Sequence, residues 1–236
     1  MAPPRVLIVI PCYNEQGTIG SLLKEIAACG YGYETIVIDD ASQDRTYEIA
    51  QELSPTVRLS RNLGIGGAVQ TGIVFACNEG YDFCIQIDGD GQHPPGETAK
   101  LLQAYSDAPR SIIVGSRYLK NDTFRSTWAR RFGRRAIAAA LNGMFQGCAI
   151  TDPTSGMRLL DRRAIAFFAR YYPHDFPEPI SLAWALRAGL TVGEVAVGMR
   201  AREHGSSSII GIKPVAYMLR VLGYILLARL KQSPFN

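Results

Sequence analysis

Short apolar runs alternate along the chain with longer segments in which apolar residues recur every three or four positions. The short runs are rich in Val and Ile and have the length of buried strands, whereas the periodic segments have the spacing of one helix face. This alternation predicts an α/β fold with a mostly parallel central sheet flanked by helices. The expected strands are residues 5–10, 34–38, 57–59, 83–87, 111–115 and 191–199. The expected helices are residues 18–30, 46–53, 68–78, 95–105, 123–145, 162–171, 181–188 and 215–230.

Glycine and proline mark two places where we expect irregular backbone. Residues 62–67 are rich in glycine and predict a turn that leads into the helix beginning at residue 68. Residues 173–179 contain three prolines, each of which lacks a backbone donor and is tolerated poorly inside a helix. We therefore expect residues 173–179 to form a loop, with the next helix beginning at Ser181.

The segment near the C-terminus predicts an amphipathic helix with basic residues along it. It is shorter and more charged than the roughly 20 apolar residues that a membrane-spanning helix needs. It suits the surface of a membrane, a contact with another copy or partner, or packing on the domain itself. We expect a main domain over residues 1–212 and this helix within residues 213–236.

Composition narrows the class of protein. A chain of 236 residues with 47% hydrophobic and 19% charged residues is long enough for one well-buried domain. The net charge of +4 permits attraction to phosphates or an anionic membrane but does not indicate a nucleic-acid-binding protein. The five cysteines are scattered without metal-binding spacing, and we expect them to be reduced thiols in a cytosolic protein without a targeting segment.

The most informative polar residues follow the apolar run 83–87. Asp88 and Asp90 lie two positions apart beside glycines, and Gln92 and His93 follow them. Carboxylate and amide oxygens suit Mg²⁺ or Mn²⁺, whose remaining ligands can come from substrate phosphates. The alternative is a solvated turn, since Asp and Gly are common in turns. A histidine in such a loop is more often structural than a ligand.

A second acidic pair follows the run 34–38. Asp39 and Asp40 are suited to accept hydrogen bonds from a nucleobase or a ribose, and Tyr13 is suited to lie against the base. The alternative is a capping loop for the helix that begins at Thr46, with Asp44 as the capping residue. Both readings can hold together.

Among the basic residues, Arg158 and Arg202 lie in loops beside glycine and hydroxyl residues, which suits bidentate binding of a phosphate. Other arrangements are absent from the sequence. It contains no GxxxxGK[ST] phosphate-binding loop and no GxGxxG dinucleotide motif. The three histidines lie in loops without visible partners for a nucleophilic triad.

Taken together, six motifs in this order resemble family 2 glycosyltransferases of the GT-A fold, nearest to the dolichyl- and polyprenyl-phosphate hexose synthase branch. The resemblance extends over residues 6–210. The matching residues are Pro11, Tyr13, Asn14 and Glu15; Asp39, Asp40, Ser42, Asp44 and Thr46; Asn62, Gly64 and Gly66; Asp88, Asp90, Gln92, His93 and Pro94; Asp152, Thr154, Ser155, Gly156 and Arg158; and Arg202, Gly205 and Ser207.

This resemblance implies a nucleotide-diphospho-sugar donor, a UDP- or GDP-sugar, bound with Mg²⁺ or Mn²⁺. It implies Asp88, Asp90 and Gln92 as the metal site and transfer with inversion by direct displacement. Arg202 and Ser207 would lie on a loop over the donor phosphates. The donor site would comprise Pro11, Tyr13, Glu15, Asp39, Asp40, Gly64, Asp88, Arg202 and Ser207. The catalytic residues would be Asp90, Asp152, Glu178 and Arg202.

The resemblance leaves the acceptor open between a lipid phosphate and a growing cell-surface glycan. A lipid phosphate is already an anion and needs no strong base, whereas a sugar hydroxyl needs a carboxylate base, for which Glu178 or Asp175 would serve. The residues implied for binding the acceptor are Arg117, Arg131, Ser155 and Arg158.

The chain departs from the lipid-linked branch because no membrane-spanning helix follows the catalytic domain in this sequence. We therefore expect a cytoplasmic protein, peripheral to the membrane through its C-terminal helix or assembled as a homo-oligomer. Two other functions fit the same pocket, a sugar-phosphate nucleotidyltransferase and a non-catalytic nucleotide-sugar-binding module. The first would want a glycine- and lysine-bearing signature that residues 11–20 lack.

Overall fold

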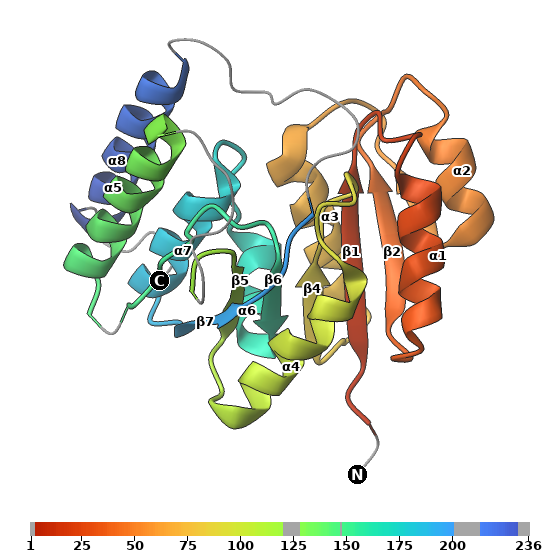
Figure 1. The fold of residues 1–236 in the computed structure, drawn as a ribbon, viewed down its shortest axis with the longest axis horizontal. Helices are drawn as coiled ribbons and strands as arrows, with labels where there is room; N and C mark the ends of the chain where they lie inside the picture. The colour runs from red at the N-terminus through yellow and green to blue at the C-terminus, as the bar shows by residue number, and fades with distance from the viewer. Residues whose placement is uncertain (1–2, 120–127, 147, 201–212, 231–236) are drawn as a thin grey trace.

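The computed structural model describes residues 3–119, 128–146, 148–200 and 213–230. Its centre is a seven-stranded sheet in the order β3-β2-β1-β4-β6-β5-β7 (Figure 1). Every neighbouring pair is parallel except the two pairs that β6 makes with β4 and β5, so the sheet is mostly parallel, as predicted. The strands are β1 (Val6–Cys12), β2 (Glu34–Asp39), β3 (Thr56–Arg58), β4 (Phe83–Gln86), β5 (Ile112–Ser116), β6 (Arg158–Asp161) and β7 (Val192–Ala196).

Helices cover both faces of the sheet. Alternate residues of one strand point to opposite faces, and in β1 Leu7 and Val9 join one core while Ile8 and Ile10 join the other. The first core lies under α3, α5, α6, α7 and α8, and the second under α1, α2 and α4. The helices are α1 (Ile19–Cys29), α2 (Thr46–Leu53), α3 (Gly64–Asn78), α4 (Thr98–Asp107), α5 (Trp128–Met144), α6 (Arg162–Arg170), α7 (Pro177–Arg187) and α8 (Lys213–Leu230), with a 3₁₀ turn at Pro95–Glu97.

Strand β6 was not expected and β7 ends three residues early, whereas two helix starts were wrong for reasons of backbone chemistry. Helix α7 begins at Pro177, inside the segment expected to be a loop, because proline is tolerated in the first turn, where its missing N–H would have no partner anyway. Helix α3 begins at Gly64 rather than at residue 68, so glycines expected to form a turn lie in its first turn. One of them, Gly66, is packed so closely on the backbone of His174 and Pro173 that a Cβ would come within 2.5 Å of the Pro173 carbonyl oxygen.

Helix α8 packs against α5 and α7. Its Val221 and Ile225 are fully buried there, so one face of the helix belongs to the core. Among the described residues, no helix is both long and apolar enough to cross a membrane. All five cysteines are free thiols.

Candidate active site

The loops that follow β1 and β2 meet at one edge of the sheet. The two strands are parallel, with Cys12 opposite Asp39, so their carboxyl ends coincide. The backbone N–H of Asp40 donates to the Cys12 carbonyl at 2.8 Å, and that of Asn14 donates to Ser42 Oγ at 2.9 Å. The two loops therefore form one bonded unit beside which β4 delivers the Asp88 loop.

The side chains expected around a nucleoside differ in how far they are exposed to solvent. Pro11 is buried within β1, Glu15 is half-buried, and Tyr13 exposes 43% of its surface. Thr18 Oγ1 lies 3.2 Å from Glu15 Oε2. Asp44 accepts the N–H of Thr46, the first residue of α2, at 2.9 Å, but the N-cap position expected for Asp44 is occupied by Arg45. Tyr13 is thus the exposed aromatic surface at this end of the sheet.

Asp39 and Asp40 are both buried but have different surroundings. Asp39 Oδ2 lies 3.3 Å from Arg58 Nε without a well-directed hydrogen bond. Asp40 Oδ1 accepts the backbone N–H of Leu63 at 2.7 Å, which fixes the entry to α3 at Gly64. Burial raises the pKa of Asp40, although these backbone donors oppose the shift. Asp40 therefore couples the β2 loop to the first turn of α3.

Backbone strain gathers in the same region. The non-glycine residues with positive φ in the described chain are Asn14, Ala41 and Phe176, at 57°, 58° and 49°. Asn14 and Ala41 lie in the two bonded loops, and Phe176 immediately precedes α7. Left-handed conformations are costly for residues with a Cβ, and they concentrate at functional sites.

The Asp88 loop is fixed from both sides. Buried His93 accepts the backbone N–H of Asp88 through Nδ1 at 3.0 Å, and Asp90 Oδ1 accepts the N–H of Gln92 at 3.0 Å. Thr18 Oγ1 donates to the Gly89 carbonyl at 2.9 Å, which ties the loop to the start of α1. His93 thus has the structural role expected for a loop histidine.

Gly156 allows the carboxylate of Asp88 to lie against the loop between α5 and β6. A Cβ at position 156 would come within 2.7 Å of Asp88 Oδ2. The Asp88 side chain is about one-third exposed, whereas Asp90 is buried. Among the described residues, no group of three or more His, Cys, Asp or Glu side chains forms a metal site. Asp88 and Asp90 are hard oxygen ligands that suit a divalent ion whose shell is completed by phosphate and water.

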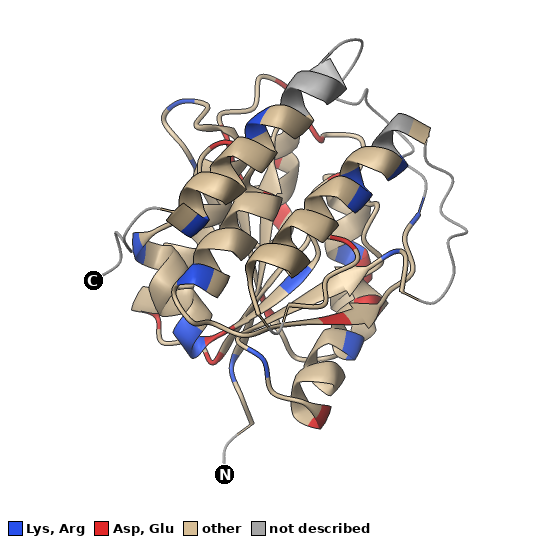
Figure 2. Cartoon of the chain, turned by 90° about the vertical axis from the view of Figure 1, so that its left-hand side faces the viewer, with Lys and Arg blue, Asp and Glu red and all other residues tan. Residues whose placement is uncertain are grey.

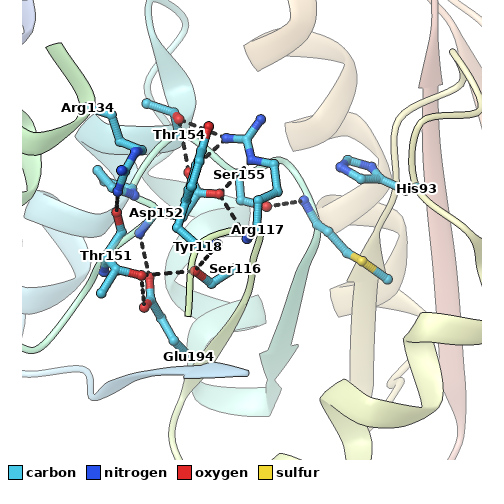
Figure 3. Close-up of polar contacts among 12 residues, drawn as sticks. His93, Ser116, Arg117, Tyr118, Arg134, Thr151, Asp152, Thr154, Ser155 and Glu194 are labelled. Atoms are coloured by element: carbon cyan, nitrogen blue, oxygen red, sulfur yellow. Dashed lines mark hydrogen bonds and ion pairs between the residues drawn. The ribbon is translucent and has the colours of Figure 1, made fainter. Parts of the chain in front are cut away.

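Arg117, which follows β5, forms a bidentate ion pair with Asp152. Its Nε lies 2.6 Å from Asp152 Oδ2 and its Nη2 lies 2.7 Å from Oδ1 (Figure 3). Thr154 Oγ1 also lies 3.0 Å from Arg117 Nη2. Burial lowers the pKa of Arg117, but the pair with Asp152 outweighs it, so the net shift is upward. Asp152 is fully buried, and its carboxylate orients Arg117.

Sequence reasoning missed Glu194, which supports this pair from β7. Its Oε1 accepts the backbone N–H groups of Thr151 and Asp152 at 2.8 and 2.7 Å, and its Oε2 accepts Thr151 Oγ1 at 2.8 Å. Burial raises the pKa of Glu194. Arg134 of α5 also donates to the Thr151 carbonyl at 2.6 Å (Figure 3). The sequence did contain a signal for this role, because Glu194 is the single acidic residue in an apolar run. A carboxylate buried in a strand requires hydrogen-bond partners.

Arg158 and Arg131, both expected to contact the acceptor, lie in contrasting places. Arg158 is buried, and its guanidinium donates to carbonyls of Ser155, Pro153 and Glu178 at 2.7–3.1 Å and to Ser181 Oγ at 2.8 Å. These contacts join the residue 152–158 loop to α7, and they favour a structural role over direct phosphate binding. Arg131 is exposed on α5. Its acceptor role stays a prediction.

Glu178 lies in the first turn of α7, close enough to Arg158 and Asp88 to feel both charges. Burial raises its pKa, Arg158 opposes that rise and Asp88 adds to it. The other candidate base, Asp175, is exposed. Such a raised pKa near the Asp88 loop makes this carboxylate a better proton acceptor than an ordinary one, which is the property that a general base needs.

Arg202 and Ser207 lie outside the described residues. The chain before them runs along the Asp88 loop, where the Arg200 N–H donates to the Gln92 carbonyl at 2.9 Å. The guanidinium of Arg200 also pairs with Glu25 of α1, with both N–O distances at 2.7 Å.

Several known proteins are similar to nearly the whole of this chain. UDP-N-acetylglucosamine–dolichyl-phosphate N-acetylglucosaminyltransferase of Methanococcus voltae is 27% identical over 94% of this chain and 97% of its own. Polyprenol monophosphomannose synthase of Mycolicibacterium smegmatis is 28% identical over 97% of this chain and 90% of its own. The crystal structure of glucosyl-3-phosphoglycerate synthase from Mycobacterium tuberculosis, in complex with Mn²⁺, UDP and glucosyl-3-phosphoglycerate, superposes with a TM-score of 0.70 at 21% identity. That match covers 96% of this chain and 80% of the synthase.

The family description Glycosyl transferase family 2 matches residues 7–167, about two-thirds of the chain. The match includes the Tyr13, Asp40, Asp88 and Asp152 loops. The chain is therefore a glycosyltransferase of family 2 with the GT-A fold.

Proposed function

We propose that this enzyme transfers a hexose from a UDP- or GDP-sugar to a polyprenyl phosphate, with inversion at the anomeric carbon and with Mg²⁺ or Mn²⁺. The observation that supports it best is the position of Asp88 and Asp90 beside the bonded β1 and β2 loops. Relatives that match this chain over nearly all of its length are named for transfer to dolichyl phosphate and for polyprenol monophosphomannose synthesis. The family assignment favours transfer over the nucleotidyltransferase and binding-module alternatives.

On the donor side, Tyr13 would lie against the base, and Glu15, Asp39, Asp40 and Gly64 would shape the nucleoside pocket. Asp88 and Asp90, with Gln92 beside them, would hold the divalent ion. When bound, that ion supplies positive charge that stabilises the departing nucleoside diphosphate. His93 and Thr18 keep the Asp88 loop in one conformation, so the two carboxylates need little reorganisation during the reaction.

On the acceptor side, a polyprenyl phosphate brings its own anionic nucleophile. Arg117, oriented by Asp152, would bind that phosphate and place one of its oxygens for direct displacement. Such an acceptor lies in a membrane, and we place the enzyme at the cytoplasmic face as a peripheral protein.

A second candidate acceptor is a glycan hydroxyl, and the surroundings of Glu178 favour it. A hydroxyl must lose its proton during displacement, and the raised pKa of Glu178 makes it a stronger base than an ordinary carboxylate.

Thermal denaturation with UDP-, GDP- and TDP-sugars, each with and without Mn²⁺, tests the donor half of the proposal. A bound donor stabilises the folded chain by mass action, so the melting temperature should rise with one nucleotide and only when metal is present. A chain whose melting temperature responds to none of these donors, while it remains folded, would contradict the proposal.

A further inference from the structure

Helices α5 and α8 run side by side and form one outer face of the molecule (Figure 1). Gly133 lies against Met218 near their first turns, and Arg229 Nε donates to the Met144 carbonyl at 3.1 Å near their last turns. The two helices are therefore parallel. Their first turns lie at the end of the molecule toward which β1 and β2 also run, which is the end that carries the candidate active site (Figure 1).

Helix α8 has two apolar stripes rather than one. Val221 and Ile225 form the stripe that packs into the core. The second stripe has helical spacing and faces solvent, with Leu219 62% exposed and Leu230 71% exposed, and Leu226 and Leu227 lie between them. A helix that only packs on its own domain needs one apolar stripe. The second stripe is therefore available to an apolar partner outside the domain.

The beginning of α5 adds aromatic surface to this face. Trp128 is 74% exposed and Phe132 is 55% exposed, and their rings stack with centroids 5.8 Å apart. Half of the large exposed apolar residues in the described chain lie on α5 and α8. Besides the residues named above, Tyr224 of α8 is one of them. Such a concentration on one face marks an interaction surface.

The charge of the two helices has one sign. Helix α5 contains four arginines and α8 contains one lysine and two arginines, and neither helix contains Asp or Glu. Figure 2 looks onto this face, and blue but no red appears on either helix. Arg131 and Arg220 are both exposed. Repulsion between two such basic faces disfavours a second copy of the chain as the partner. Attraction between basic residues and anions instead favours an anionic surface.

We propose that the α5–α8 face docks on an anionic lipid bilayer, with the aromatic and leucine side chains in the headgroup boundary and the arginines on lipid phosphates. Apolar side chains combined with basic residues are the chemistry by which helices bind in the plane of a membrane. The inference builds on the proposed function, because a polyprenyl-phosphate acceptor lies in such a bilayer. Vesicle binding can nevertheless be measured without donor or turnover, so the docking proposal and the proposed function can fail separately.

Trp128 is a built-in probe of this docking. The chain has two tryptophans, so Trp184→Phe of the full chain leaves Trp128 as the only one. On addition of phosphatidylcholine vesicles that contain phosphatidylglycerol, Trp128 fluorescence should shift to the blue and should be quenched by brominated acyl chains. A blue shift without quenching by brominated lipid would overturn the proposal, because it would show burial against protein.

Cosedimentation with the same vesicles identifies the contributing residues. Leu226→Ser with Leu230→Ser should lower binding at least tenfold, and Arg220→Glu should lower it on the order of tenfold, since each basic residue near an anionic surface contributes about fivefold. Leu53→Ser on α2 is the matched control, because Leu53 is 45% exposed on another face, and it should bind like the parent chain.

Three results would overturn the docking surface. The first is equal binding to vesicles of phosphatidylcholine alone, which would remove the role of anionic lipid. The second is equal loss in the Leu53→Ser control. The third is a concentration-dependent dimer in solution that the Leu226→Ser, Leu230→Ser variant abolishes, which would assign the face to a second copy.

Discussion

The guanidinium of Arg117, just after β5, and the carboxylate of Asp152, in the loop between α5 and β6, form a two-point ion pair with N–O distances of 2.6 and 2.7 Å. The carboxylate is fully buried, and Glu194 holds the backbone beneath it. Arg117 is therefore held in one orientation, which would lower the entropic cost of binding the proposed acceptor phosphate.

Replacing Arg117 should mainly affect binding of the acceptor, whereas replacing Asp152 should mainly affect the stability of the fold. Arg117→Lys keeps the charge but loses the two-point geometry, so we expect the KM for the acceptor to rise at least tenfold while the KM for the donor changes little. Asp152→Asn leaves the partly buried Arg117 charge uncompensated and should lower the free energy of unfolding by about 3 kcal/mol. Steady-state kinetics and urea denaturation measure the two effects. A rise in donor KM with unchanged acceptor KM would place Arg117 on the donor side instead.

Gly156→Ala should disturb Asp88 without unfolding the domain. The added methyl group would lie 2.7 Å from Asp88 Oδ2 and must displace the carboxylate. We expect a higher Mn²⁺ concentration for half-maximal activity, by roughly an order of magnitude, with little change in melting temperature. Gly143→Ala is the control, because a Cβ there meets no atom within 4 Å. Equal metal requirements in the two variants would argue against Asp88 as a ligand.

Glu178→Gln distinguishes the two acceptor classes. With a polyprenyl phosphate the nucleophile is already ionised, so transfer should remain within a few-fold of the parent enzyme. With a sugar hydroxyl the loss of a general base should reduce kcat by about 10²–10⁴. Both rates are measured with the same donor and each acceptor offered separately, and a large loss with polyprenyl phosphate would show that Glu178 has another role.

The raised pKa of Glu178 also predicts a pH dependence of stability. The folded chain holds this proton more tightly than the unfolded chain, whose carboxyl has its ordinary pKa of 4.5. Stability from this group is therefore present below pH 4.5 and is lost as pH rises through the raised pKa. Glu178→Gln removes this term, so its unfolding free energy relative to the parent should increase as pH rises across that interval. Glu52→Gln, at an exposed position of α2, controls for the loss of one negative charge.

Local patterns were sufficient to predict the strand ends that carry the residues proposed for the donor. The apolar runs ended where β1, β2 and β4 end, within about two residues, and parallel strands bring their ends to one edge. Helix α2 occupies Thr46–Leu53 as predicted.

The surroundings of the residues proposed for the acceptor depend on contacts between residues far apart in the chain, which local patterns do not encode. Strand β6 inserts antiparallel between β4 and β5, and Glu194 reaches Asp152 from the edge strand β7. Arg158 illustrates the consequence. Its loop of glycine and hydroxyl residues suggested phosphate binding, but the fold buries its guanidinium among carbonyls of the same loop and α7.

The most direct test of the proposed function is transfer of a radiolabelled hexose from UDP- and GDP-sugars to polyprenyl phosphate, read as label in the organic phase. We compare the parent enzyme with Asp90→Asn, with and without a metal chelator. We expect transfer from one donor by the parent enzyme, its loss with chelator, and at least a hundredfold loss in a folded Asp90→Asn variant. Chelator-resistant transfer that Asp90→Asn retains in full would contradict the proposed function.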